Sequence, residues 1–200
     1  MTSEGEIPMQ ELKERIRNEA KVLPGNIIKV DGFLNHRIDT ELMDHIAEEF
    51  GKHFNMDEVS VILTAEASGI ALSAIVARHF NKPMIFAKKA KSDNIEGGLY
   101  QSDIFSYTYK KKVTLLVSKE WLSADDKVLV IDDFMANGEA MRGLCDIVTA
   151  AGATLVGIGC AVEKGFQGGG DRLRAAGVNL KSLAIIESAE PGNIVFRDEA

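Results

Sequence analysis

The sequence predicts an α/β fold in which a central, mostly parallel β-sheet is covered by helices. From residue 59 onward, short apolar segments rich in β-branched residues alternate with segments of helical periodicity. Strands that alternate with helices pair in parallel, because each helix returns the chain to the same end of the sheet. In addition, two acids, a small-residue loop and a helix directly follow the strand Val128–Ile131. Open parallel sheets bind ligands where such loops leave the strands.

The first thirty residues predict a helix and a short strand. Leu12 and Ile16 recur at helical spacing within the helix Met9–Ala20. A Pro-Gly pair then separates this helix from the strand Ile27–Val30. The polar and aromatic letters DGFLNHRID follow, beginning at Asp31.

The segment from residue 40 to residue 162 supplies the alternating pattern. Thr40–Phe50 predicts a helix that is capped by an oxygen side chain, with Leu42, Ile46 and Phe50 on one face. The elements expected after it are strand Val59–Thr64, helix Ile70–Phe80, strand Pro83–Ala87, strand Val128–Ile131, helix Glu139–Ala151 and strand Thr154–Val162.

Residues 88–103 interrupt the alternation. This segment is rich in lysine, contains two adjacent glycines and has no periodicity that would bury one face. We therefore expect a flexible surface loop. The apolar residues 104–109 and 112–118 predict an antiparallel pair of strands that projects this loop over the sheet.

Composition predicts a single cytoplasmic domain that spans residues 1–200. The hydrophobic content of 46% is enough for one buried core. The 30 acidic and 23 basic residues give a net charge of −7, which disfavours nucleic acid as a partner. Neither a signal peptide nor an apolar run of membrane-spanning length is present, so we expect no membrane partner. Cys145 and Cys160 lie in apolar segments without metal-ligand spacing, as expected of reduced core cysteines.

The segment Val128–Ala140, with the letters VLVIDDFMANGEA, carries the strongest functional signal. Asp132 and Asp133 follow a buried strand and can accept hydrogen bonds from the vicinal hydroxyls of a sugar. The small residues of Ala136–Ala140 let the backbone approach a phosphate, and the next helix presents unpaired N–H groups. On spacing alone, the alternative that the two acids only cap this helix stays open.

This segment resembles the signature of type I phosphoribosyltransferases, which bind phosphoribosyl pyrophosphate (PRPP). Four further segments are similar to the bacterial members that use xanthine, namely IKVDGFLNHRID, EASGIA, FAKKAKS and GIGCAVEKGFQ. The resemblance covers nearly the whole chain and implies the type I fold, with a flexible loop and a small hood over the base site. Residues 1–40 and the C-terminal segment would form most of this hood.

Two positions depart from the usual pattern of the family. Asn137 stands where the family usually has Thr, which keeps a side-chain donor for phosphate but changes its shape. Ala136 stands where hypoxanthine-guanine members carry an Asp that has been proposed as general base. The resemblance therefore leaves no residue assigned as the base.

The resemblance implies which residues bind PRPP. Asp132 and Asp133 would hold the ribose hydroxyls as the catalytic acids, and the turn Glu66–Gly69 would contact pyrophosphate, often across a cis peptide. The full PRPP-binding set would be Glu66, Ala67, Ser68, Gly69, Lys88, Lys89, Ala136, Asn137, Gly138, Glu139 and Ala140, with Lys91 as a further loop lysine. Without the resemblance, Ser68 reads as an ordinary helix cap and the lysines read as a solvated surface.

The base site requires a flat apolar slot with a few polar contacts. Phe134 is placed to pack on a purine ring, and Lys164 can donate to a 6-oxo group, although they also fit a core residue and a solvated strand end. In the resembling enzymes, residues that match Ile28 and Asn35 also line this site, and the Asn35 amide would donate to the 2-oxo group of xanthine. His36 reads as a bystander.

We therefore expect an enzyme that converts xanthine and PRPP to xanthosine 5′-monophosphate and pyrophosphate. Mg²⁺ is the expected cofactor, held mainly by the phosphates of the substrate, and no protein ligand is assigned to it. Family members usually form dimers, so a homodimer is expected. The alternatives are a PRPP-sensing gene regulator without catalysis and an enzyme that prefers guanine, hypoxanthine or adenine. Only about thirty residues precede KVDGFLNH, too few for a DNA-binding domain.

Overall fold

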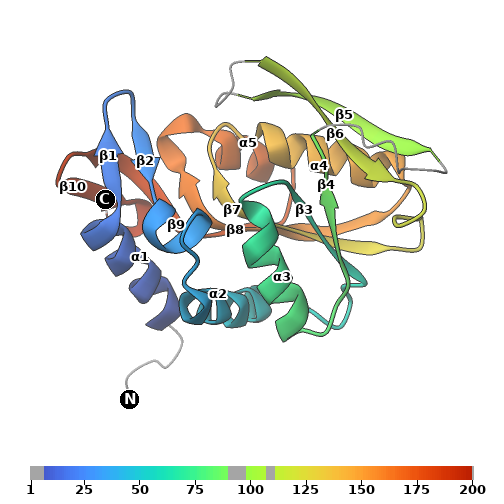
Figure 1. Ribbon diagram of the computed structural model, residues 1–200, viewed down its shortest axis with the longest axis horizontal. Coiled ribbons are helices and arrows are strands. Elements are labelled where there is room, and N and C mark those ends of the chain that lie inside the picture. The colour runs from blue at the N-terminus through green and yellow to red at the C-terminus, as the bar shows by residue number, and fades with distance from the viewer. Residues whose placement is uncertain (1–6, 90–97, 107–110, 200) are drawn as a thin grey trace.

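A computed structural model describes residues 7–89, 98–106 and 111–199 (Figure 1). Its centre is a six-stranded sheet with the strand order β10-β9-β8-β7-β3-β4. These strands are β3 Val61–Ala65, β4 Met84–Ala87, β7 Lys127–Met135, β8 Thr154–Lys164, β9 Leu180–Glu190 and β10 Asn193–Phe196. The helices are α1 Ile7–Glu19, α2 Thr40–His53, α3 Gly69–His79, α4 Glu139–Ala150 and α5 Gly169–Ala175.

The strands of the central sheet run almost entirely in one direction. β4, β3, β7, β8 and β9 pair in parallel, whereas the edge strand β10 is antiparallel to β9. Parallel neighbours need a crossover between them, and α3 and α4 supply the crossovers that follow β3 and β7. The predicted α/β fold with a mostly parallel sheet is therefore confirmed.

Each face of the central sheet packs against its own apolar core. On β7, Leu129 and Ile131 contribute to the core that α2 and α3 cover, whereas Val128 and Val130 contribute to the core beneath α4. Successive side chains of a strand point to opposite faces, so a strand covered on both faces is apolar throughout. Figure 1 shows α2 and α3 on one side of the sheet and α4 on the other. None of the helices in the described ranges is long and apolar enough to cross a membrane.

Helix α2 begins at the predicted residue and is capped by a carboxylate. Asp39 Oδ1 accepts a hydrogen bond from the backbone N–H of Leu42 at 3.2 Å. Asp39 Oδ2 accepts a second hydrogen bond from Arg15 Nη1 at 2.8 Å, which joins α1 to α2. The hydrogen bond from Arg15 lowers the pKa of Asp39. The helix continues to His53, about one turn beyond the predicted end at Phe50.

The N-terminal segment lies against the C-terminal end of the chain. Strands β1 (Lys21–Leu23) and β2 (Ile27–Lys29) form an antiparallel hairpin, and a single π-helical turn follows at Asp31–Asn35. Lys13 on α1 forms an ion pair with Asp198 and lies 5.6 Å from the centre of the Phe196 ring. These contacts join the two segments that the sequence assigns to the hood.

The antiparallel pair after the lysine-rich segment is present but is longer than predicted. β5 (Leu99–Ser106) pairs with β6 (Lys111–Ser118), and β5 begins within the segment that was expected to be loop. Ser102 Oγ donates to Asp146 Oδ2 on α4 at 2.8 Å, so alternate residues of β5 face this helix. The loop prediction for residues 99–103 is therefore wrong, because their period of two supports a strand. Residues 90–97 and 107–110 lie outside the described part of the chain.

The sequence prediction also missed the last elements of the sheet. β9 pairs with β8 on one side and with the edge strand β10 on the other, and α5 follows a single 3₁₀ turn at Gly165–Gln167. α5 is only 7 residues long, which is too short for a helical period to be recognised. Charged residues at both ends of β9 obscure the apolar centre of that strand.

Phe50→Ala is expected to lower the free energy of unfolding by about 3–5 kcal/mol, because it removes a large ring from a packed core. Phe50 is fully buried, and a Cβ on Gly159 would lie 2.9 Å from its ring. Trp121 is 65% exposed, so Trp121→Ala should change stability by no more than about 0.5 kcal/mol. Urea titration measures both values. Similar losses for the two variants would contradict the packing described here.

Candidate active site

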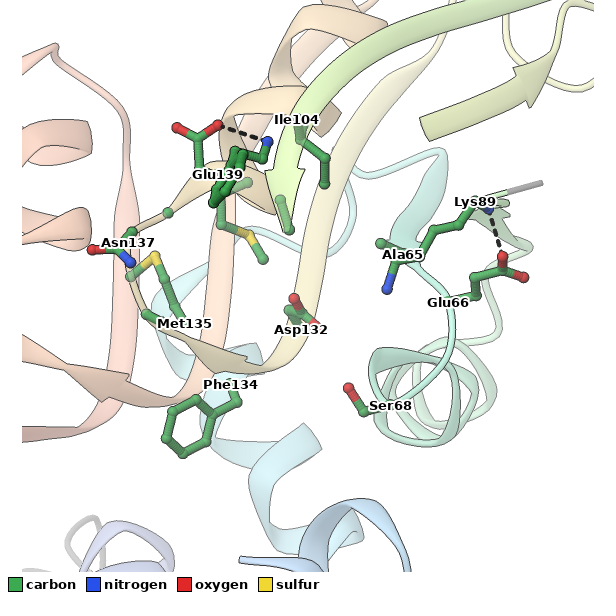
Figure 2. A pocket seen from close by; sticks show the side chains of 15 residues that line it. Ala65, Glu66, Ser68, Lys89, Ile104, Asp132, Phe134, Met135, Asn137 and Glu139 are labelled. Atoms are coloured by element: carbon green, nitrogen blue, oxygen red, sulfur yellow. Dashed lines mark hydrogen bonds between the residues drawn. The ribbon is translucent and has the colours of Figure 1, made fainter. Parts of the chain in front are cut away.

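A cavity of about 200 Å³ opens where β3 and β7 end and the next helices begin. Figure 2 shows Asp132 between the turn that carries Ser68 and the loop that carries Asn137. Lys89 lies on the same side as Ser68, across the cavity from Asn137. Parallel strands end at the same edge of a sheet, so residues far apart in the sequence meet here. The predicted site residues in its wall are Glu66, Ser68, Lys89, Asp132, Phe134, Ala136, Asn137, Gly138, Glu139 and Ala140.

Ala136–Gly138 connects β7 to α4, and the whole segment Ala136–Ala140, which includes the first two residues of the helix, lines the cavity. Gly138 is the N-cap of α4 and has a φ of 77°, a conformation that glycine adopts without strain. Gly138 has no side chain that could cap the helix, so the first N–H groups of α4 stay available for an anion. The loop therefore has the local chemistry of a phosphate site.

The carboxylate of Glu139 is held at the side of this loop. Glu139 Oε2 accepts hydrogen bonds from the backbone N–H of Phe105 at 3.3 Å and from Arg142 Nη2 at 3.2 Å. The hydrogen bond from Arg142 is the main cause that lowers the pKa of Glu139. Figure 2 shows this carboxylate turned toward β5. The guanidinium group of Arg142 neutralises its negative charge beside the phosphate loop.

The two acids at the end of β7 have different surroundings. Asp132 lies beside Gly69, where a Cβ would come within 3.0 Å of both Asp132 Oδ1 and Thr64 Oγ1. Asp133 is 1% exposed and accepts a hydrogen bond from Asn35 Nδ2 at 3.0 Å. The backbone N–H of Asp133 donates to Asp132 Oδ1 at 3.0 Å. Since Gly138 is the N-cap of α4, the alternative that these acids cap the helix is wrong.

Burial raises the pKa of Asp132, and the negative charge of Asp133 raises it further. Thr64 Oγ1 is buried and has no hydrogen-bond partner among the described residues. The end of β7 therefore holds more negative charge than a stable core prefers, and the neighbouring strand β3 carries one unsatisfied hydroxyl. A ligand that brings hydroxyl donors or positive charge would relieve both conditions.

The turn Glu66–Gly69 forms a second wall of the site. The peptide between Glu66 and Ala67 is cis, as the family resemblance implies. A carboxylate oxygen of Glu66 accepts a hydrogen bond from the backbone N–H of Lys89, shown dashed in Figure 2. Ser68 occupies the N-cap position of α3, as the alternative interpretation predicted, but its hydroxyl makes no capping hydrogen bond. The Ser68 hydroxyl lines the cavity instead.

The two described lysines of the predicted loop take different directions. Lys89 lines the cavity beside Glu66. Lys88 forms a backbone bridge with Leu116 and lines another hollow, together with Phe86 and Trp121. Neighbouring residues of an extended segment point to opposite sides, which is why the structure does not bring Lys88 to this site. Lys91 and most of the predicted lysine loop lie outside the described residues.

The predicted base-site residues meet on the hood side of the sheet. Lys164 Nζ lies 5.4 Å from the centre of the Phe134 ring and donates a hydrogen bond to the Asn26 carbonyl at 3.0 Å. Burial lowers the pKa of Lys164. Ile28 is buried on β2, within the core that Phe134 also contacts. Phe134 thus lines the cavity and also contacts Lys164, so it lies between the cavity and the other predicted base-site residues.

Several cavity residues were not identified from the sequence. Ile104 and Phe105 contribute from β5, and Met135 and Met141 flank the phosphate loop. The alternation of Ser102 and Ile104 was the available signal for β5. The two methionines have no sequence signal, because apolar residues beside a loop are expected anywhere in a core.

The carboxylates of this site do not form a complete metal site by themselves. Among the described residues, no group of three or more His, Cys, Asp or Glu side chains is arranged to hold a metal ion. Mg²⁺ prefers phosphate oxygens, a few carboxylates and water. The acid-rich end of β7 therefore fits a magnesium ion that arrives with a phosphorylated ligand.

Comparison with known proteins identifies similar sequences and folds. The phosphoribosyl transferase domain family matches residues 32–176. Xanthine phosphoribosyltransferase from Bifidobacterium animalis subsp. lactis (strain AD011) is 53% identical over 192 residues, covering 94% of this chain and 100% of the relative. The xanthine phosphoribosyltransferase from Alkaliphilus metalliredigens (strain QYMF) is 49% identical, covering 96% of this chain and 95% of the relative.

Solved structures share the fold at low sequence identity. APRTase from Giardia lamblia, complexed with 9-deazaadenine, has a TM-score of 0.75 and 21% identity and covers 90% of this chain and 98% of its own. Adenine phosphoribosyltransferase from Saccharomyces cerevisiae has a TM-score of 0.74 and 18% identity, with coverage of 88% and 98%. The type I fold expected from the sequence is therefore confirmed.

Asp132→Asn is expected to raise the thermal midpoint at pH 8, and this gain should shrink as the pH falls. The pKa of Asp132 is raised in the folded chain, so its ionisation destabilises the native state above that pKa. As the pH falls below the raised pKa, Asp132 takes up a proton in the native state, so the penalty shrinks and is gone below the ordinary pKa of an aspartate. Each kcal/mol gained in the free energy of unfolding raises the thermal midpoint by about 2–4 °C in a domain of this size. Thermal scans of both proteins from pH 8 downward measure the gain.

Asp126→Asn is the matched control, with the opposite sign. Burial opposes the shift, but hydrogen bonds from Ser123 and Ser60 leave the pKa of Asp126 lowered. This group stabilises the native state at neutral pH, and its contribution is lost as the pH falls through the lowered pKa. Asp126→Asn should therefore lower the midpoint at pH 8. A midpoint of Asp132→Asn that equals wild type at every pH would refute the buried-charge account.

Proposed function

Because this chain belongs to the phosphoribosyl transferase domain family, we propose that it converts xanthine and PRPP to xanthosine 5′-monophosphate and pyrophosphate. The observation that carries the proposal is the identity of about half of all residues to xanthine phosphoribosyltransferases along their whole length. This activity is the one that the sequence predicted. We further propose that the enzyme acts in the cytoplasm as a homodimer, as the family resemblance implies.

The ribose 5-phosphate half of PRPP fits the β7 edge of the site. In this proposal the loop Ala136–Ala140 binds the 5-phosphate through backbone N–H groups at the start of α4. Asp132 and Asp133 accept hydrogen bonds from the ribose hydroxyls. The support is chemical, because two buried carboxylates need donors and a phosphate needs unpaired N–H groups.

The pyrophosphate half fits the opposite wall. Glu66–Gly69 offers backbone N–H groups at the start of α3, and Lys89 contributes positive charge to the same cavity. Mg²⁺, bound mainly by the substrate phosphates and assisted by Asp132, would neutralise charge on the departing diphosphate. Lys89 would stabilise that same charge by direct contact with an oxygen of the leaving group.

The purine fits between the hood and Phe134. Lys164 supplies a donor for the 6-oxo group, and Asn35 supplies a second N–H for the 2-oxo group, since one is already given to Asp133. Both groups are donors, so they match the two carbonyl oxygens of xanthine. Adenine presents an amino group where xanthine has its 6-oxo acceptor, which would leave Lys164 facing another donor.

The reaction is a displacement at C1 of the ribose. N9 of xanthine forms a bond to C1 while the bond from C1 to the pyrophosphate oxygen breaks, and the imidazole proton of the base is released to water. Positive charge grows on the sugar during this step, and the carboxylates of Asp132 and Asp133 are placed to stabilise it. Positioning of the two substrates and electrostatic stabilisation supply most of the acceleration. No described residue is assigned as a general base.

A panel of four purine bases with PRPP and Mg²⁺ tests the proposal. Pyrophosphate release should be fastest with xanthine, followed by guanine and hypoxanthine, and kcat/KM for adenine should be lower by at least about a hundredfold. Asp133→Asn should lower turnover with xanthine by about a hundredfold or more without lowering the thermal midpoint, because it removes the charge that repels Asp132. Preference for adenine would overturn the base assignment, and full activity of Asp133→Asn would remove the acid from the mechanism.

Asn35→Ala tests the 2-oxo contact. Xanthine has this oxygen and hypoxanthine lacks it, so kcat/KM should fall about tenfold more with xanthine than with hypoxanthine. The variant also removes the hydrogen bond to Asp133, so KM for PRPP should rise by the same factor with either base. Steady-state kinetics with both bases separate the two effects. Equal losses of kcat/KM would exclude Asn35 from the 2-oxo contact.

A further inference from the structure

Helix α5 and the turn before it support the back of the phosphate loop. A Cβ on Gly169 would lie 2.6 Å from the Asn137 carbonyl carbon and 2.7 Å from the Gly138 nitrogen. A Cβ on Gly138 would lie 3.4 Å from the Gly169 Cα. The two segments therefore touch backbone to backbone, and α5 limits where the loop can lie.

Arg172 joins α5 to this loop through a hydrogen bond. Its Nη2 donates to the Asn137 carbonyl at 3.0 Å, and its Nη1 donates to the Gln167 carbonyl at 3.4 Å. A guanidinium group is planar and presents its donors as a rigid fork, so one side chain can hold two carbonyl groups in a fixed relation. Lysine has a single ammonium group on a flexible chain and cannot reproduce this geometry.

Holding the Asn137 carbonyl also fixes the direction of a backbone donor. The carbonyl of Asn137 and the N–H of Gly138 belong to one planar trans peptide, so they point in opposite directions. With the carbonyl turned toward Arg172, the N–H of Gly138 points away from Arg172. Asn137 and Gly138 both line the cavity, where that N–H is one of the donors available to a phosphate.

Two ion pairs hold α5 in place. Arg174 forms a two-pronged pair with Glu163 on β8, with distances of 3.1 and 2.6 Å. Glu163 is fully buried, and a Cβ on Gly170 would lie within 3.0 Å of its carboxylate. Arg197 binds Asp171 with distances of 2.6 and 3.1 Å. A helix of 7 residues is not stable alone, so these anchors determine where Arg172 stands.

We propose that Arg172 is a positioning residue for the 5-phosphate site, which fixes the Asn137–Gly138 peptide and orients its N–H toward the phosphate. The inference rests on the proposed function in so far as the phosphate belongs to PRPP. Arg172 acts through the loop and makes no contact with the reacting atoms. It therefore affects binding of the ribose 5-phosphate half and leaves binding of the base unchanged.

Arg172→Ala and Arg172→Lys should each raise KM for PRPP about tenfold, with KM for xanthine within about twofold of wild type. Arg172 is exposed, so the variants should fold. Calorimetric titration with ribose 5-phosphate should give a Kd raised by the same factor. Arg78→Ala removes an exposed arginine from α3 and is the matched control, which should bind ribose 5-phosphate as wild type does.

Three outcomes would overturn the inference. Recovery of wild-type values by Arg172→Lys would mean that charge alone acts at this position. A parallel rise of KM for both substrates would indicate a general structural effect. An unchanged Kd for ribose 5-phosphate in Arg172→Ala would mean that the loop holds its shape without Arg172. If the wild-type protein turns over no purine base, the proposed function fails, whereas the Kd comparison still decides the role of Arg172.

Discussion

The site depends on a pair of adjacent carboxylates held out of water at the end of β7. Asp132 is 7% exposed and Asp133 is 1% exposed, so their mutual repulsion is weakly screened. Burial and this repulsion raise the pKa of Asp132. Apolar cores on both faces of β7 hold the strand that carries the two acids. The packing of these cores stabilises the fold enough to offset the repulsion between the two carboxylates. A ligand that brings a sugar diol and metal-bound phosphates would relieve the repulsion between the carboxylates, and this relief would strengthen binding.

The phosphate loop gains its shape from close backbone contacts rather than from side chains. Gly138 takes a positive φ at the start of α4, and Gly169 lies against it from the next crossover. Any side chain at Gly169 would force the loop outward. Gly169, the first residue of α5, thus shapes the phosphate loop together with the small residues after β7. The ion pair between buried Glu163 on β8 and partly exposed Arg174 holds α5 in place beside the phosphate loop.

Two hydrogen bonds join the hood to the central sheet. Asn35 lies on the π-helical turn of the hood and donates to Asp133 on the sheet. Lys164 lies at the end of β8 and donates to Asn26 between the two hood strands. Asn35 and Lys164, which we propose bind the purine, therefore also join the hood to the sheet. Loss of either one is expected to weaken the contact between the hood and the sheet as well as recognition of the purine.

The sequence by itself determined the α/β class, the parallel central strands, the acid pair and the small-residue loop, because these depend on local periodicity and on consecutive residues. It did not determine β9, β10 or α5, whose patterns are short or interrupted by charges. Only the tertiary structure decided that Lys89 lines the cavity while Lys88 does not, and that Asn35 reaches Asp133. Such contacts join residues distant along the chain, and their geometry is fixed by packing of the sheet, which no local pattern encodes.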